Sequence, residues 1–354
     1  MNRRALLGLS LLAVAAVGGG VLLTPRDAAP PDPDQAGLAF PNLAPRLAAA
    51  ARIEIRHGDD TLTLQRGAGE AWVLPAKSGY PARADRVREV LVGLTELRLV
   101  ERRTANPELF ARLGVEDPAT PGGTAYGIRV LDAGGIPIAE LITGHRRVRT
   151  QGDRPESIYV RRPGEDLAWL AEGRLNIDSD VQLWIDRDVA NLPHDRVLAV
   201  TIRRDDQVTE FRRSGDPDGV LTVTAPADAG TLDPNAVEDI GRGFEFLTFT
   251  DVLPEAQLTA EPVGEASFTL TEGLVITVRT GRKDENIWVR LGATGSDEAK
   301  RLDARWHGWA YQVGAWKEKA FAPRLVDLRE QPAATQQPGE RPPVLPPGAP
   351  APPP

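Results

Sequence analysis

Few side chains in this sequence are of the types that bind metals or carry out nucleophilic catalysis. The 354 residues include four histidines and no cysteine. No two of His57, His145, His194 and His307 are three or four residues apart, the spacing that places two ligands on one helix face. A zinc site needs three or four nitrogen, sulfur or oxygen ligands, and thiolate chemistry needs cysteine. We therefore expect no metal site and no cofactor.

One stretch matches the start of a calcium-binding loop. Asn176, Asp178 and Asp180 place oxygen atoms at positions one, three and five. Position six is Val181 where the loop needs glycine, and position twelve is Arg187 where it needs a bidentate glutamate. We interpret this stretch as a polar turn.

Motifs for nucleotide binding and acyl transfer are incomplete or absent in the sequence. The run Gly241-Arg242-Gly243-Phe244 lacks the third glycine of a dinucleotide fingerprint, and no Gly-x-Ser-x-Gly motif occurs. Catalytic triads and carboxylate pairs assemble only in three dimensions, so the sequence cannot reveal them. With 50 acidic residues, it also gives no reason to prefer one possible pair of catalytic carboxylates over another. We expect a protein that is not an enzyme, and an unrecognised envelope hydrolase remains an alternative.

Six arginines are concentrated in and beside one predicted loop. They are Arg146, Arg147, Arg149, Arg154, Arg161 and Arg162. Guanidinium groups suit phosphate and carboxylate recognition, so these residues could contact lipid headgroups or an acidic partner. Asp153, Glu156 and Glu165 lie among them, and the favoured interpretation is a solvated loop with local ion pairs. Each such pair contributes only ~0–1 kcal/mol to stability.

Aromatic residues cluster near the end of the predicted fold, at Trp306, Trp309, Tyr311 and Trp316. Exposed tryptophan rings can stack on sugars, so a glycan-binding patch is one interpretation. Trp309, Tyr311 and Val313 alternate as strand residues do, which favours packing in a core. Under that interpretation, Trp309→Ala is predicted to cost ~3–5 kcal/mol.

The elements that position these residues repeat along the chain. A hairpin pattern at residues 53–64 recurs at 200–213, where Ile202 follows Ile55 by 147 positions. An amphipathic helix pattern from Val87 recurs from Val237, 150 positions later. Three further strands are predicted in each half, at residues 126–131, 136–142 and 157–161, and at residues 267–270, 274–278 and 287–291.

These patterns predict an α+β fold of two tandem similar units, each of mainly antiparallel sheet with one amphipathic helix, after an N-terminal transmembrane helix. The expected segments are a signal-anchor helix (1–24), a Pro/Ala-rich linker (25–50), the first repeat (51–193), the second repeat (194–330) and a disordered Pro-rich tail (331–354).

The N-terminal segment has the composition of a membrane anchor. Residues 5–23 are apolar and span roughly 28 Å as a helix, close to the ~30 Å of a hydrocarbon core. Arg3 and Arg4 predict a cytoplasmic N-terminus, with the main domain exported. The same stretch also fits a cleaved secretory signal, since Ala13-Val14-Ala15 forms a small-residue pattern. A net charge of −8 disfavours nucleic acid as a partner.

Several short motifs resemble those of the domain-of-unknown-function 4340 family over residues 40–328. They are Phe40-Pro41-x-Leu43, Trp72-x-Leu74, Gly79-Tyr80-Pro81-Ala82, Arg112-Leu113-Gly114-Val115-Glu116-Asp117-Pro118 and Ile158-Tyr159-Val160-Arg161. The resemblance implies a bacterial inner-membrane protein with its main domain in the periplasm, often found with gliding-motility-type ABC transport systems. It implies no catalytic residue. We expect an accessory or interaction subunit, and an envelope module that binds glycan or anionic lipid is the alternative.

Overall fold

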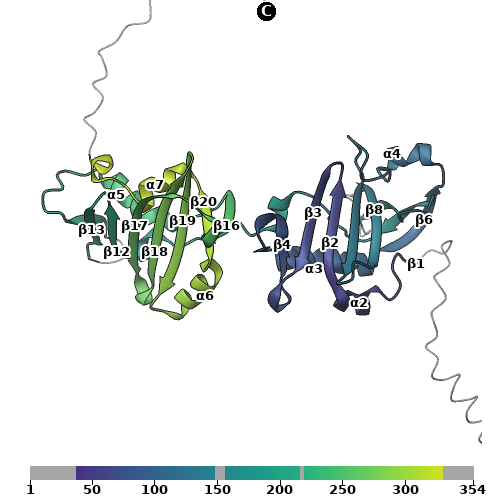
Figure 1. Cartoon of the computed structure of the whole chain (residues 1–354), viewed down its shortest axis with the longest axis horizontal. Coiled ribbons are helices and arrows are strands. Elements are labelled where there is room, and N and C mark those ends of the chain that lie inside the picture. The colour runs from purple at the N-terminus through teal and green to yellow at the C-terminus, as the bar shows by residue number, and fades with distance from the viewer. Residues whose placement is uncertain (1–36, 148–155, 216–218, 330–354) are drawn as a thin grey trace, which may run out of the picture. The chain divides into compact units, whose positions relative to one another are not determined.

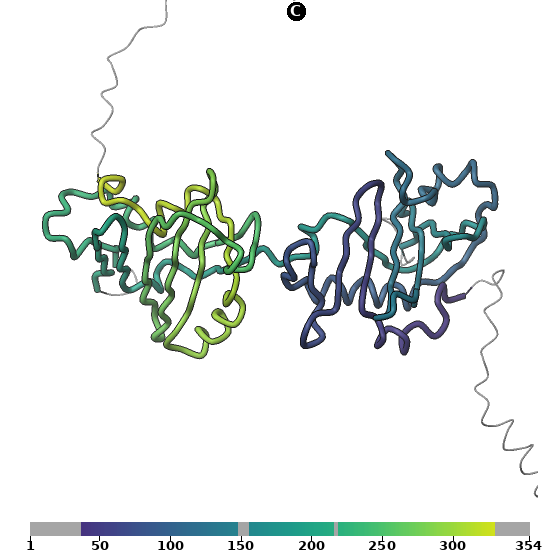
Figure 2. The backbone as a smooth tube through the Cα atoms, viewed as in Figure 1, coloured from purple at the N-terminus to yellow at the C-terminus, as the bar shows by residue number. Residues whose placement is uncertain are grey.

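The computed structural model describes residues 37–147, 156–215 and 219–329, which form two compact units. Unit 1 comprises the described residues up to Pro75 and residues 81–184, and unit 2 comprises residues 76–80 and those from Ile185 onward. Figure 1 shows the ribbon and Figure 2 traces the backbone of each unit.

Unit 1 is built on one sheet with the strand order β1-β6-β10-β9-β8-β7-β2-β3-β4-β5, and Tyr80 of the last strand is part of unit 2. The strands are β1 (Gly37–Leu38), β2 (Ala50–His57), β3 (Asp60–Arg66), β4 (Trp72–Leu74), β5 (Tyr80–Pro81), β6 (Arg98–Thr104), β7 (Tyr126–Asp132), β8 (Pro137–Arg147), β9 (Ser157–Arg161) and β10 (Ala168–Glu172). Its helices are α2 (Leu43–Arg46), α3 (Ala84–Glu96) and α4 (Phe110–Leu113), with short 3₁₀ turns η1 (Leu47–Ala49), η2 (Ala68–Glu70), η3 (Pro75–Lys77), η4 (Pro107–Leu109) and η5 (Val181–Trp184).

Helix α3 covers one face of the sheet in unit 1. Ile53 and Ile55 of β2 are fully buried on that face, because alternate strand residues point to the same side. Val87, Val90 and Leu94 lie three or four positions apart on α3 and are also buried. In Figure 1, α3 runs behind β2 and β3. The face that carries α3 is called the inner face below, and the opposite face is called the outer face.

Unit 2 contains a sheet with the order β14-β13-β12-β17-β18-β19-β20-β16, and β11 pairs separately with β15. The strands are β11 (Asp188–Ala190), β12 (Val197–Arg204), β13 (Gln207–Arg213), β14 (Leu221–Ala225), β15 (Leu247–Thr248), β16 (Asp251–Pro254), β17 (Glu261–Leu270), β18 (Val275–Lys283), β19 (Asn286–Thr294) and β20 (Trp309–Val313). The helices are α5 (Pro234–Gly241), α6 (Asp297–Trp306) and α7 (Glu318–Phe321), with 3₁₀ turns η6 (His194–Arg196), η7 (Arg242–Phe244), η8 (Glu255–Gln257), η9 (Thr271–Gly273), η10 (Ala315–Lys317) and η11 (Leu325–Leu328).

Helix α5 contains the apolar pattern predicted from Val237 and begins at a defined cap. The Asp233 side chain accepts a hydrogen bond of 2.9 Å from the Asn235 amide, and Pro234 occupies the first helical position. Phe244, which follows α5 in η7, packs edge-to-face on Phe268 of β17, with 4.8 Å between ring centroids. The core of unit 2 therefore lies between the α5–η7 segment and the sheet.

In each unit, a short segment packs on the outer face of the sheet, which in unit 2 is the face opposite Phe268. In unit 1, residues 107–115, which include η4 and α4, bring Phe110 and Val115 against Tyr159 of β9. In unit 2, residues 253–260 bring Leu253 and Leu258 against Trp288 of β19. We call these two stretches the covering segments.

The α+β class and the antiparallel sheets are confirmed. The units divide after Trp184, earlier than the expected boundary at residue 193, because β11 pairs with β15 and so belongs to unit 2. The anchor at residues 5–23 and the tail at 331–354 lie outside the described residues. Within the part of the chain that is described, no helix is long and apolar enough to cross a membrane.

Candidate functional site

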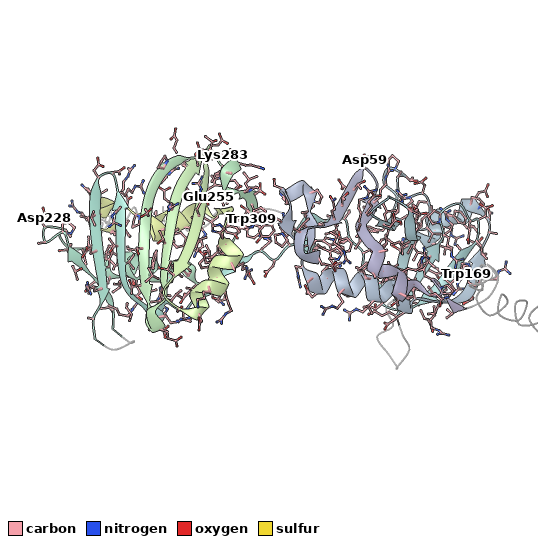
Figure 3. The ribbon with its side chains drawn as sticks, turned by 60° about the horizontal axis from the view of Figure 1, so that its bottom comes forward. Asp59, Trp169, Asp228, Glu255, Lys283 and Trp309 are labelled. Atoms are coloured by element: carbon pink, nitrogen blue, oxygen red, sulfur yellow. The ribbon has the colours of Figure 1, made fainter. Side chains whose placement is uncertain are left out.

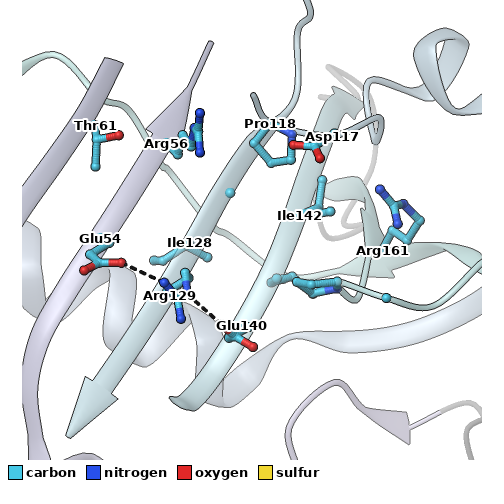
Figure 4. A pocket seen from close by; sticks show the side chains of 14 residues that line it. Glu54, Arg56, Thr61, Asp117, Pro118, Ile128, Arg129, Glu140, Ile142 and Arg161 are labelled. Carbon is cyan, nitrogen blue, oxygen red and sulfur yellow. Dashed lines mark hydrogen bonds and ion pairs between the residues drawn. The ribbon is translucent and has the colours of Figure 1, made fainter. Parts of the chain in front are cut away.

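A hollow of about 390 Å³ lies on the outer face of unit 1 (Figure 4). Five strands, the loop after α4 and the loop after β9 contribute its lining. The lining residues are Glu54, Arg56, Thr61, Asp117, Pro118, Gly127, Ile128, Arg129, Glu140, Leu141, Ile142, Arg161, Pro163 and Gly164.

A row of three charged side chains crosses neighbouring strands along one side of this hollow. Arg129 of β7 contacts Glu54 of β2 at 3.1 Å and Glu140 of β8 at 2.6 Å. Figure 4 shows the three side chains in line. The hydrogen bond that Arg129 Nε donates to the Glu140 carboxylate raises the pKa of Arg129 above its usual value, against the effect of partial burial. The row is thus a fixed pattern of alternating charge on a rigid sheet.

The opposite side of the hollow is formed by Arg161 of β9. Its Nε donates to the Val115 carbonyl at 2.8 Å and its Nη1 donates to the Glu165 carbonyl at 3.1 Å. The guanidinium also lies over the Phe110 ring, 4.6 Å from the centroid. Burial lowers the pKa of Arg161, although Asp117 and other nearby carboxylates oppose this shift. Arg161 therefore fastens the covering segment of unit 1 to the sheet.

The loop that closes the hollow rests directly on β7. The Gly58 amide donates to the Pro118 carbonyl at 2.7 Å, and a Cβ on Gly127 would lie 2.9 Å from Pro118 Cγ. Glycine at position 127 is therefore needed for this close approach. Glu116 ties the far end of the loop by accepting from the Thr124 amide at 2.6 Å.

The six arginines selected from the sequence do not form one surface among the described residues. Arg146 pairs with Glu156 at 2.5 Å and Arg147 is exposed. Arg161 holds the covering segment, and Arg162 donates to the Ala39 carbonyl at 2.9 Å. The remaining two, at positions 149 and 154, lie outside the described residues.

The three tryptophans of the aromatic cluster occupy different environments in unit 2. Trp306 is fully buried, and its indole nitrogen donates to the Val189 carbonyl at 3.0 Å. Trp309, labelled in Figure 3, is half-buried and packs edge-to-face on Tyr80 with 4.9 Å between centroids. Trp316 is 64% exposed. The three residues therefore do not share one role.

Sequence reasoning missed Lys317, which is 2% exposed. Its Nζ donates to the carbonyl oxygen of Gly243 at 2.5 Å and to that of Glu245 at 3.3 Å. Burial lowers the pKa of this amine to about 8, although the nearby Glu245 carboxylate opposes the shift. Its partners lie more than seventy residues earlier in the chain, so no local pattern could have revealed them.

The fold and the hollow define a sheet protein with a charged outer surface, and comparison with known families agrees with the motifs. The family model described as "Domain of unknown function (DUF4340)" matches residues 72–265, and the chain belongs to this family. No curated protein and no solved structure matches the chain.

Proposed function

We propose that this protein is a non-catalytic interaction subunit, anchored in the bacterial inner membrane by residues 5–23, with both units in the periplasm. Its partner is a component of an ABC-type transport or envelope complex. The apolar segment at residues 5–23 and the arginines before it support the anchor. The resemblance to the family implies an envelope location, and the family model that matches residues 72–265 supports that resemblance.

The observation that carries the proposal is the charged outer face of unit 1. Its carboxylates and guanidinium groups are held by strand backbones and by each other, as in the row through Arg129. Charge patterns of this kind select a partner and orient it, because a matching surface must present the opposite pattern. Pre-formed side chains also lower the entropy cost of binding.

We also propose that the two units are copies of one ancestral unit. The order β4-β3-β2-β7-β8-β9-β10-β6 in unit 1 matches the order β14-β13-β12-β17-β18-β19-β20-β16 in unit 2, strand for strand. Tyr159 and Trp288 occupy equivalent strands and pack on the covering segments. Arg161 and Arg290 follow them two positions later, and each donates to a backbone carbonyl, of Val115 and Leu258 respectively.

The test is co-purification of the full chain from native membranes in mild detergent. We expect a stoichiometric envelope protein with the parent chain and at least roughly tenfold less of it with Arg56→Glu, which reverses a rim charge, a loss of ~1.4 kcal/mol. Arg147→Glu, an exposed change outside the hollow, is the control and should retain the partner.

Deletion of residues 5–23 should move the chain from the membrane to the soluble fraction. Recovery of the parent chain only as a monomer from native membranes, or equal capture with Arg56→Glu, would contradict the proposal.

A further inference from the structure

Two large aromatic side chains of unit 2 are exposed to solvent. Phe246 is 78% exposed and Trp316 is 64% exposed. Phe246 also has a φ of 47°, a conformation that is an outlier for a bulky residue. An exposed aromatic ring at a strained backbone position costs free energy, so it calls for a compensating interaction.

The same buried amine connects the two segments that carry these aromatic residues. Lys317 Nζ is 4.2 Å from the Trp316 ring centroid and 3.3 Å from the carbonyl oxygen of Glu245, the residue before Phe246. The ammonium group lies over the indole, and 64% of Trp316 is still exposed and open to a ligand. We call Phe246 and Trp316 the aromatic platform.

The backbone of the platform is held in place by hydrogen bonds. The Phe246 amide donates to Asn191 Oδ1 at 3.2 Å. The preceding Glu245 carboxylate accepts from the His194 backbone amide at 3.0 Å and lies 2.7 Å from the His194 ring. The Lys317 amine and the Glu245 carboxylate interact with opposite charges at this site. A rigid aromatic surface with such offset charges suits an uncharged ligand with apolar rings better than a strongly charged one.

The chain itself carries such a ligand. Residues 342–354 contain eight prolines and no charged side chain. Proline-rich segments favour the polyproline II conformation, and aromatic surfaces recognise them because little entropy remains to be lost.

The proline-rich segment begins close enough to reach the platform. The last described residues lie at the start of α5, where the Asp233 amide donates to the Leu328 carbonyl at 2.9 Å. Phe246 follows the other end of the α5–η7 segment, which spans about 17 Å at the helical rise. Residues 331–340 can span about 31 Å at 3.1 Å per residue. Residues 331–340 are therefore a tether long enough for the proline-rich segment to reach Phe246.

We propose that residues 342–354 dock on the aromatic platform of Phe246 and Trp316 in the same chain. The tether makes the effective concentration of the segment millimolar, so even a weak contact is substantially occupied. A partner that uses the platform must then displace the chain's own tail. This proposal does not depend on the hollow of unit 1.

The absence of cysteine allows a specific test in the full-length chain. Val344→Cys provides a single thiol for a bimane label, whose fluorescence tryptophan quenches at contact distance. We expect strong quenching in this chain, and recovery of most of the emission when Trp316→Phe removes the quencher. Phe246→Gly should also restore emission while Trp316 remains, because the docking ring is lost. Glycine tolerates the positive φ, so this variant should fold at least as well.

Ile136→Ala is the matched control, since Ile136 is a similarly exposed apolar residue, at 66%, of unit 1. It should leave the quenching unchanged, and dilution should leave it unchanged too. Quenching that falls on dilution would assign the contact to a second copy and overturn the proposal. Equal emission from the parent and from Trp316→Phe, or unchanged quenching in Phe246→Gly, would also overturn it.

Discussion

At the scale of single residues, the most informative side chains in this protein are long cations that bind backbone carbonyls. Arg161 and Arg290 each hold a covering segment, and Lys317 holds the carbonyls at the end of η7. Such groups satisfy carbonyls that would otherwise be left unpaired on leaving water. Their positive charge therefore serves the fold, whereas the sequence favoured a solvated loop with local ion pairs for Arg161.

Replacing Arg161 should loosen the covering segment of unit 1. Arg161→Gln removes two hydrogen bonds and a cation–π contact, so we expect a loss of ~1.5–3 kcal/mol in unfolding free energy. Denaturant unfolding would measure it, with the exposed Arg147→Gln as control at under ~0.5 kcal/mol. Equal stability of the two variants would show that the carbonyls find other partners.

Lys317 should make stability depend on pH in the alkaline range. Its pKa is about 8 in the fold and 10.5 as its ordinary value, so between these values the unfolded chain binds more protons. Unfolding free energy should therefore rise with pH from 8 to 10.5, by at most about 3 kcal/mol, and this gain is lost as pH falls through 8. Lys317→Met should lack the rise, as denaturant titrations at each pH would reveal. Parallel profiles for the two proteins would refute this assignment.

At the scale of elements, the spacing of apolar residues predicted the strands and helices that have one buried face. The two hairpins and helices α3 and α5 were foreseen, because alternating and helical apolar spacing marks a buried face. Strand β6 was missed because five of its seven residues are polar, and β10 because its residues do not alternate. The hollow depends on contacts such as that of Arg161 with Val115, and no local pattern encodes them.

Helix α3 packs so closely that one glycine on it should resist replacement. A Cβ at Gly93 would lie 2.4 Å from the Arg174 carbonyl oxygen. Gly93→Ala should therefore destabilise unit 1 by ~1–3 kcal/mol, although alanine normally stabilises a helix by about 1 kcal/mol. Gly37→Ala, where nothing lies within 4 Å, is the control for calorimetry. A higher melting temperature for Gly93→Ala would disprove the close approach.

At the scale of the whole molecule, the proposed duplication makes equivalent positions comparable. Ile55 and Ile202 occupy equivalent strands and are 0% and 2% exposed. Each substitution by alanine should cost its own unit ~2–5 kcal/mol through the cavity it leaves. Hydrogen exchange resolved by unit would measure the two losses separately. A large loss in one unit and none in the other would argue against matched cores.

The limits of the family match at residues 72 and 265 also have a practical consequence for protein expression. A fragment cut at these limits would lack β2 and β3 from the middle of one sheet, and β18, β19 and β20 from the other. The two truncated sheets would expose strand edges with unpaired backbone N–H and C=O groups, which pair readily with other chains. A fragment of this chain limited to residues 72–265 is therefore expected to aggregate into inclusion bodies when expressed.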